Sequence, residues 1–174
     1  MRALVTGFGP FNGVPENPSA ELARLSGQRF EVLEVSYEAA EQFVNRLDPS
    51  SFDHWLMLGV AASRKLLSME LFARNARGGE DVRGVKSESE IEKGGPLLLE
   101  ASLWKPDLVA DLLQSDPDRI QTSMDAGAYL CNFLSYVGLR RFPEKSLGFL
   151  HVVLPGEIPL EAQAAVVKRV LDCI

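Results

Sequence analysis

The segment from Ser123 to Asn132 places a cysteine where it could act as a nucleophile. A strand-like stretch ends near Ser123, small residues follow, and a helix is expected to carry Cys131 in its first turn or two. The free N–H groups and partial positive charge of a helix N-terminus favour thiolate, the nucleophilic form, and could also stabilise an oxyanion. A buried structural cysteine is the alternative, and from position alone it is the more common one.

Two further side chains could complete such a site. His151 lies near the end of the strand predicted at 147–153, and open α/β sheets bind ligands beyond the carboxyl ends of their strands. Glu70 interrupts an apolar run, which is costly unless its carboxylate is paired. That partner could be an arginine in a structural ion pair or an imidazole in a triad, and His151 could equally be satisfied by local backbone. His54 precedes its strand beside Asp53, so we expect it in solvent at the opposite edge.

The elements that must position these residues alternate between strands and helices. Short hydrophobic runs bounded by turn residues predict strands, and amphipathic stretches predict helices. The expected strands are 2–7, 30–35, 55–59, 119–124 and 147–153, with 66–75 extended, and the expected helices are 18–25, 39–47, 105–114, 126–141 and 159–172. This alternation indicates an α/β sheet covered on both faces. Residues 76–95 form a long polar segment, of a length often used as a functional lid or an interface element.

The composition narrows the class of protein. The chain has 174 residues, which suggests a single domain over 1–174, and a formal net charge of -6, which argues against a general nucleic-acid binder. Two cysteines and two histidines are too few for a disulfide framework or a histidine-rich metal site. No stretch approaches the roughly 20 apolar residues of a membrane span, and the N-terminus lacks a signal-peptide pattern. We therefore expect a cytoplasmic protein without membrane or nucleic-acid partners, in which a free cysteine stays available for chemistry.

Longer motifs surround the three candidate residues. The cysteine motif consists of Ile120, Ser123, Asp125-Ala126-Gly127 and Tyr129-Leu130-Cys131-Asn132, and the glutamate motif of Gly59, Ala62, Leu67-Ser68, Glu70, Ala73 and Asn75. With the opening residues 6–11, Asn17-Pro18-Ser19 and the stretch 148–152, these motifs resemble those of pyroglutamyl peptidase I (pyrrolidone carboxyl peptidase), a family of cysteine peptidases. The resemblance covers nearly the whole chain in the right order. Leu71 and Phe72 depart from it, because the family usually has a basic and then a small aliphatic residue there.

The resemblance implies a three-layer α/β/α sandwich around a mixed, mostly parallel sheet, with a Cys131–His151–Glu70 triad. Cys131 would attack the carbonyl that follows an N-terminal pyroglutamate, His151 would be general base and later acid, and Glu70 would orient His151. Water would then hydrolyse the thioester, without a metal or organic cofactor. The substrates would be small peptides with N-terminal pyroglutamate, and a homodimer or a homotetramer is compatible with the family.

Two other functions compete with this one. The first is a related thiol amidohydrolase that acts on another small amide or lactam, motivated by Tyr129 and by the altered region 71–95. The second is a catalytically silent relative that binds peptides or other partners, and the intact triad counts against it.

The resemblance also implies a substrate pocket. Pyroglutamate is an uncharged lactam, so its pocket should have apolar walls and a few hydrogen bonds. Phe8 and Phe11 match the phenylalanines that pack on the ring, and Tyr129 stands where the family usually has phenylalanine. The full expected set of binding residues is Phe8, Phe11, Asn17, Tyr129, Leu130 and Arg83. Arg83 is the nearest counterpart of a family arginine near the active site, and Arg77 competes with it for that role.

Overall fold

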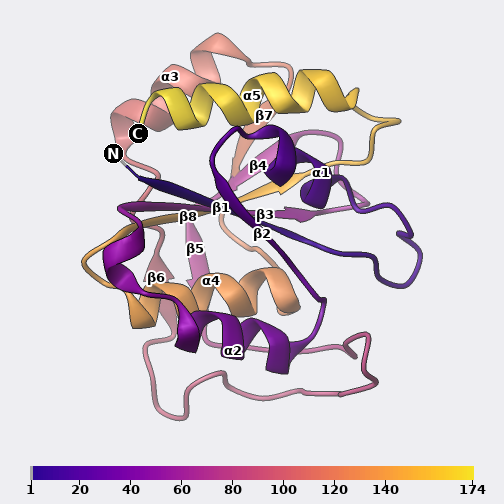
Figure 1. The fold of residues 1–174 in the computed structure, drawn as a ribbon, viewed down its shortest axis with the longest axis vertical. Coiled ribbons are helices and arrows are strands. Elements are labelled where there is room, and N and C mark those ends of the chain that lie inside the picture. The colour runs from indigo at the N-terminus through magenta and orange to yellow at the C-terminus, as the bar shows by residue number, and fades with distance from the viewer. Residues whose placement is uncertain (1) are drawn as a thin grey trace.

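A central sheet with helices on both sides organises the computed structural model, which describes residues 2–174 (Figure 1). Six strands pair in the order β2-β1-β3-β8-β4-β7. Their bounds are β1 Ala3–Phe8, β2 Arg29–Leu33, β3 His54–Val60, β4 Leu67–Glu70, β7 Ile120–Ser123 and β8 Ser146–Val152. Neighbouring strands are parallel except for β4 and β8, which are antiparallel. The sheet is therefore mixed and mostly parallel, as the resemblance predicted.

The helices cover the two faces of this sheet in two groups. Helices α1 (Pro18–Leu25), α3 (Pro106–Ser115) and α5 (Leu160–Asp172) lie on one face, and α2 (Tyr37–Arg46) and α4 (Leu130–Arg141) lie on the other (Figure 1). Each face has its own buried apolar cluster, one packed under α2 and α4 and one under α1, α3 and α5. The predicted three-layer sandwich is thus confirmed. Between residues 2 and 174, none of the helices has the length and apolar character needed to cross a membrane.

The reversed strand β4 determines which side chains meet at the centre of the sheet. Ser68 of β4 lies opposite His151 of β8, and Glu70 lies opposite Phe149. In an antiparallel pair, residues two apart along a strand share a face, and diagonal neighbours remain within reach of each other. Glu70 is therefore placed on the same face of the sheet as His151.

The reversal also explains a difference from the predicted helix at 126–141. Strand β7 is parallel to β4, so it too runs against β8. The chain must turn back before the next helix can begin, and residues 124–129 make this turn. Helix α4 accordingly begins at Leu130 and not at 126.

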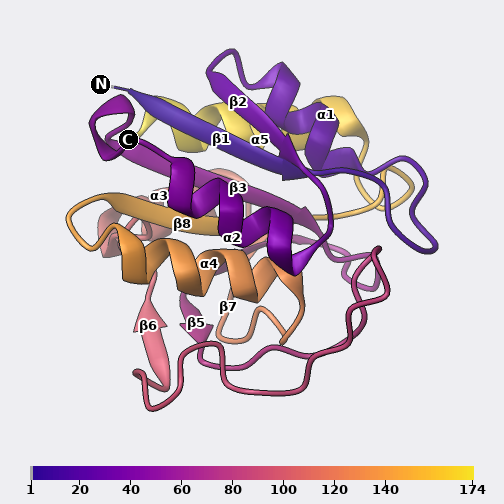
Figure 2. The same cartoon turned by 60° about the horizontal axis from the view of Figure 1, so that its bottom comes forward.

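The segment predicted as extended at 66–75 contains β4 and a second strand, β5 (Phe72–Arg74). Strand β5 pairs with β6 (Leu98–Glu100), a three-residue strand that the sequence did not reveal because it is too short to show a pattern. Residues 76–95 connect these two strands as a loop that follows the α2 and α4 face (Figure 2). Tyr37 Oη donates to the Gly78 carbonyl and Asn132 Nδ2 donates to the Ala76 carbonyl, each at 2.8 Å. The beginning of the loop is therefore held against both helices.

Helix α1 approaches strand β1 so closely that only glycine fits at one position. A Cβ atom on Gly7 would lie 2.2 Å from the Ser19 carbonyl oxygen. The Ser19 hydroxyl also accepts a hydrogen bond from Phe8 N at 3.0 Å, which fixes the start of the helix against the end of the strand. Phe8 is thereby held at the carboxyl end of β1.

We predict that Gly7→Ala lowers the free energy of unfolding by about 1–3 kcal/mol, because the added methyl group overpacks this contact. Denaturant unfolding followed by circular dichroism measures the change. Gly156→Ala is the control, since no atom among the described residues lies within 4 Å of the Cβ it would add. Equal midpoints for the two variants would contradict the prediction.

Candidate active site

Cys131 is the second residue of α4, and the turn before it is fixed by polar contacts. Gly127 adopts a φ of +83°, in the left-handed region that favours glycine. Its N–H donates to Asp125 Oδ1 at 2.8 Å, and its carbonyl accepts from Arg74 Nε at 2.9 Å. Cys131 therefore stands in the first turn of a helix whose N-terminus is held in place, as the sequence predicted.

Asn132 connects this helix to strand β5. Its side chain is fully buried, Oδ1 accepts from Arg74 N at 2.8 Å, and Nδ2 donates to the carbonyls of Arg74 at 2.9 Å and Ala76 at 2.8 Å. A buried amide with this many partners is a strong local constraint. The sequence assigned Asn132 no role, and its place beside Cys131 in the motif is the only signal of one.

His151 and Glu70 form a buried hydrogen-bonded contact in the site. His151 Nδ1 lies 2.6 Å from Glu70 Oε1, and the two side chains are 6% and 1% exposed. Since Nδ1 faces a carboxylate, it carries the proton and leaves Nε2 available as a base. Burial opposes ionisation of Glu70, but the hydrogen bond and charge of His151, together with Arg64, outweigh it and lower the pKa of Glu70. The carboxylate is therefore ionised at neutral pH.

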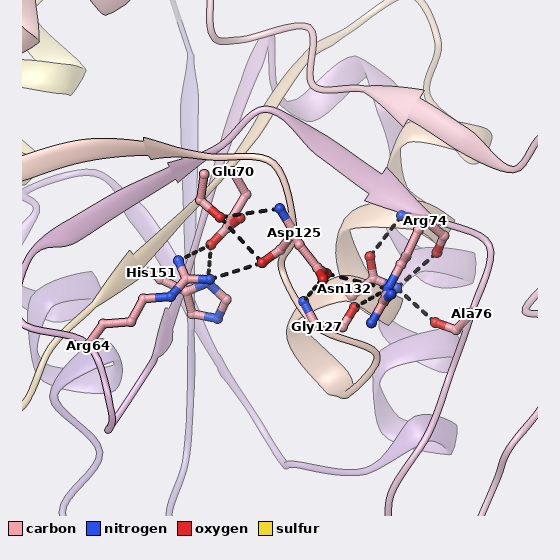
Figure 3. A network of polar contacts seen from close by, with 9 residues as sticks. Arg64, Glu70, Arg74, Ala76, Asp125, Gly127, Asn132 and His151 are labelled. Atoms are coloured by element: carbon pink, nitrogen blue, oxygen red, sulfur yellow. Dashed lines mark hydrogen bonds and ion pairs between the residues drawn. The ribbon is translucent and has the colours of Figure 1, made fainter.

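Arg64 is a third member of this group that sequence reasoning missed. Its Nη1 donates to Glu70 Oε1 at 2.5 Å and its Nη2 donates to the Asp125 carbonyl at 2.9 Å (Figure 3). The partner of Glu70 was left open between an arginine and an imidazole, and the structure contains both. No local pattern marks Arg64, because the loop that carries it meets Glu70 and Asp125 only after folding.

A cavity of about 320 Å³ opens beside the cysteine and the histidine. It is lined by Phe8, Phe11, Asn17, Val35, Val60, Ala62, Ser63, Ala126, Tyr129, Leu130, Cys131 and His151. The structure thus brings together five of the six residues expected to bind substrate. Apart from the histidine and the cysteine, the lining side chains carry no ionisable group except the Tyr129 hydroxyl, which donates to the Glu80 carbonyl at 2.8 Å. Such a cavity suits a small, uncharged group.

Asn17 lines the cavity with an amide that is already engaged. Its Oδ1 accepts from Ser19 N at 3.1 Å and from Ser19 Oγ at 2.8 Å, and its Nδ2 donates to the Gly9 carbonyl at 3.0 Å. Asn17 is the N-cap of α1 and holds the opening loop against that helix. This places Phe8 and Phe11 at the cavity.

The sixth expected residue, Arg83, does not line the cavity. Its guanidinium pairs with Glu34 at 2.8 Å and with Glu38 at 2.6 Å on the outer side of α2. Its competitor Arg77 stacks over the Tyr37 ring, 5.6 Å from the centroid. The arginine that contacts Glu70 is Arg64, which corrects the expectation that Arg83 lies near the site. The spacing was misleading because Glu34 and Glu38 hold the Arg83 guanidinium away from the cavity.

The Cys131 sulfur packs against the sheet, in a side chain of intermediate exposure. A Cβ on Gly59 would lie 2.7 Å from Sγ, so glycine at that position makes room for the sulfur. Burial, followed by the nearby Glu70 carboxylate, raises the pKa of Cys131 to about 12. Desolvation therefore opposes the thiolate that the helix N-terminus favours. A base must remove the proton when the sulfur reacts, and His151 lines the same cavity.

Known proteins match the chain over nearly all of its length. A family model described as pyroglutamyl peptidase matches residues 1–168. The pyrrolidone-carboxylate peptidase of Oceanobacillus iheyensis is 29% identical, over 99% of this chain and 97% of its own, and that of Pyrococcus furiosus is 32% identical, over 87% and 80%. The crystal structure of pyrrolidone carboxyl peptidase from Thermus thermophilus is similar with a TM-score of 0.88 and 34% identity, over 99% of this chain and 100% of that chain.

We predict that the rate at which iodoacetamide alkylates Cys131 rises about tenfold per pH unit up to pH about 12, since only thiolate reacts. A cysteine in a short unstructured peptide should instead level off above its ordinary pKa of about 8.5. Peptide mass mapping separates Cys131 from the exposed Cys173. A plateau for Cys131 near neutral pH would show that the thiolate exists at rest.

Proposed function

The chain belongs to the pyroglutamyl peptidase family, and we propose that Cys131, His151 and Glu70 perform in it the hydrolytic removal of N-terminal pyroglutamate from peptides. The observation that carries the proposal is the shared cavity. Cys131 and His151 both line it, His151 is oriented by the buried Glu70, and the remaining walls are uncharged. A nucleophile, its base and a neutral binding pocket are thereby combined in one place.

The chemistry begins with proton transfer from the Cys131 thiol to His151 Nε2 as Sγ attacks the carbonyl carbon of pyroglutamate. The imidazolium that forms is stabilised by Glu70, which accepts from Nδ1. N–H groups at the N-terminus of α4 are suited to stabilise the oxyanion of the tetrahedral intermediate, since the first turn of a helix has no internal partner for them. The carbon–nitrogen bond then breaks, and His151 returns the proton to the departing amine. Water, deprotonated by His151, hydrolyses the thioester and regenerates the thiol.

The pocket fits the pyroglutamyl ring by its shape and its lack of fixed charge. The five-membered lactam is small and neutral, and the aromatic side chains of Phe8, Phe11 and Tyr129 offer apolar walls for it. A peptide that begins with an ordinary residue carries a charged ammonium group there. Placing that charge in this cavity would cost desolvation without a carboxylate to compensate. Selectivity for the blocked N-terminus follows.

The wider setting is part of the same proposal. Residues 1–174 act as one catalytic domain on small peptides in the cytoplasm, without a metal or organic cofactor. Both cysteines are free, as suits a reducing compartment. The choice between a homodimer and a homotetramer stays a prediction, and sedimentation of the purified protein would decide it.

We predict that Cys131→Ala and His151→Ala each reduce kcat on pyroglutamyl-coumarylamide by roughly a thousandfold or more, because each removes a group that reacts. Glu70→Gln should retain more activity, since it keeps a hydrogen-bond acceptor but loses the charge. Cys173→Ala is the matched control and should behave as wild type, because this thiol is exposed on the last turn of the chain. Near wild-type turnover by Cys131→Ala would refute the mechanism.

The alternative of another amide substrate is tested with the same protein. Wild type should cleave the pyroglutamyl compound and leave prolyl- and alanyl-coumarylamide essentially intact. Preferential cleavage of either of the latter would move the assignment to a different thiol amidohydrolase. No cleavage of any of the three by a folded protein would favour the silent peptide-binding relative.

We predict that Phe11→Ala lowers kcat/KM for the pyroglutamyl substrate about ten- to a hundredfold, from roughly 1.5–3 kcal/mol of lost apolar contact. Tyr129→Phe keeps the ring and loses only the hydrogen bond to Glu80, so its loss should be smaller. Phe8 is 3% exposed and belongs to the core, so Phe11 is the cleaner probe. Phe30→Ala, at an exposed position on β2, is the control. Unchanged kinetics in a folded Phe11→Ala protein would remove Phe11 from the pocket.

A further inference from the structure

We propose that Arg64 is a positioning residue that couples the Glu70–His151 pair to the turn carrying the nucleophile, and that keeps Glu70 an anion throughout turnover. This proposal rests on the function proposed above, since it assigns a role within the same site. Arg64 lies outside the cavity lining, so it acts on substrate only through other residues.

The geometry of the guanidinium is the first argument. One planar group donates from Nη1 to Glu70 Oε1 and from Nη2 to the Asp125 carbonyl (Figure 3). Glu70 belongs to β4, whereas Asp125 belongs to the turn that leads into the helix of Cys131. Because the two donors are rigidly joined, the acid–base pair and the nucleophile's turn are held at a fixed separation.

The second argument concerns the charge on His151 during the reaction. His151 is neutral before attack, positive in the tetrahedral intermediate, and neutral again in the thioester. Glu70 is 1% exposed, and a buried carboxylate without a compensating charge is costly. The Arg64 guanidinium is positively charged throughout, and it contacts the same Glu70 oxygen, Oε1, that His151 contacts. The carboxylate therefore remains ionised in the steps in which His151 is neutral.

Among residues 2–174, the groups around Glu70 leave this role to Arg64. The side chains that face or influence Glu70 are His151 from β8, Cys131 from α4, Ser123 from β7 and Arg64 from the loop before β4. Arg74 is the nearest comparable arginine in the network, and it contacts the Asp125 carboxylate and the Gly127 carbonyl. Arg74 thus anchors the same turn without a contact to Glu70, which makes it a matched control.

The experiment compares Arg64→Met, Arg64→Lys and Arg74→Met in the full chain, with pyroglutamyl-coumarylamide as substrate. Arg64→Met should lower kcat about ten- to a hundredfold with KM within roughly twofold of wild type. The acid limb of its pH–kcat profile should move to higher pH. Loss of the positive charge raises the pKa of Glu70, and the reaction needs the Glu70 anion. Arg64→Lys keeps the charge but not the paired donors, so it should retain the wild-type limb and lose part of kcat.

Arg74→Met should keep the wild-type acid limb whatever its effect on kcat, because it loosens only the turn. If Arg64→Met and Arg74→Met shared one pH profile with wild type, Arg64 would be a simple structural anchor and the proposal would be overturned. In the Glu70→Gln background, Arg64→Met should cost several-fold less than in wild type. Equal losses in the two backgrounds would likewise overturn the proposal.

Alkylation of Cys131 by iodoacetamide separates this proposal from the peptidase assignment, since it needs no substrate. The charge of Arg64 favours the Cys131 thiolate, so Arg64→Met should slow alkylation several-fold at fixed pH while Arg74→Met and Arg64→Lys do not. If the wild-type protein failed to cleave the substrate, the proposed function would be refuted, but the alkylation rates would still test the role of Arg64. Equal alkylation rates in all variants would refute the proposed role of Arg64. If circular dichroism shows that Arg64→Met does not fold, Arg64→Lys decides, and a kcat equal to that of wild type would then overturn the proposal.

Discussion

The contact between His151 Nδ1 and Glu70 Oε1 depends on the direction of one short strand. Strand β4 has four residues and runs against β8, which puts Ser68 opposite His151 and Glu70 on the diagonal of the same face. A carboxylate buried to 1% exposure must meet its partner at hydrogen-bond distance or lose its charge. Register, burial and ionisation at this point are therefore a single constraint.

The rest of the site is arranged around that constraint in two layers. Behind the Glu70–His151 pair lie the charged groups, and Arg64 and Arg74 connect the turn at Asp125 to the strands. In front lies a cavity whose walls are apolar or neutral. Glu70, Arg64 and Arg74 do not line this cavity. A neutral lactam in this cavity would therefore not have to displace water from the charged groups behind it.

Local sequence patterns predicted those features of the site that depend on neighbouring residues. Small residues before Cys131 indicated a helix start, and apolar runs with a polar end indicated the strands of Glu70 and His151. The family resemblance supplied their assembly into one triad. The start of α4 at Leu130 escaped prediction because Gly127 lies in the left-handed region within a turn that only the reversed strands require.

Other features depend on contacts between distant segments, and no spacing reveals them. Arg64 meets Asp125 across 61 positions of the chain, and the ion pairs of Arg83 with Glu34 and Glu38 depend on how the loop after β5 folds. Asn17 was expected to bind substrate, yet its amide is engaged with Ser19 and Gly9. A helix N-terminus is visible in the sequence, whereas the desolvation that raises the pKa of Cys131 depends on tertiary packing.

The burial of the Cys131 sulfur also governs what happens to it between substrates. Peroxides and other oxidants attack thiolates, and the ladder from sulfenic to sulfonic acid begins with that ionised form. A thiol whose pKa is raised to about 12 offers almost none of it at neutral pH. Desolvation of the sulfur therefore disfavours the ionised form that oxidants attack. The packing that makes a base necessary for the reaction therefore also protects the thiol from oxidation between substrates.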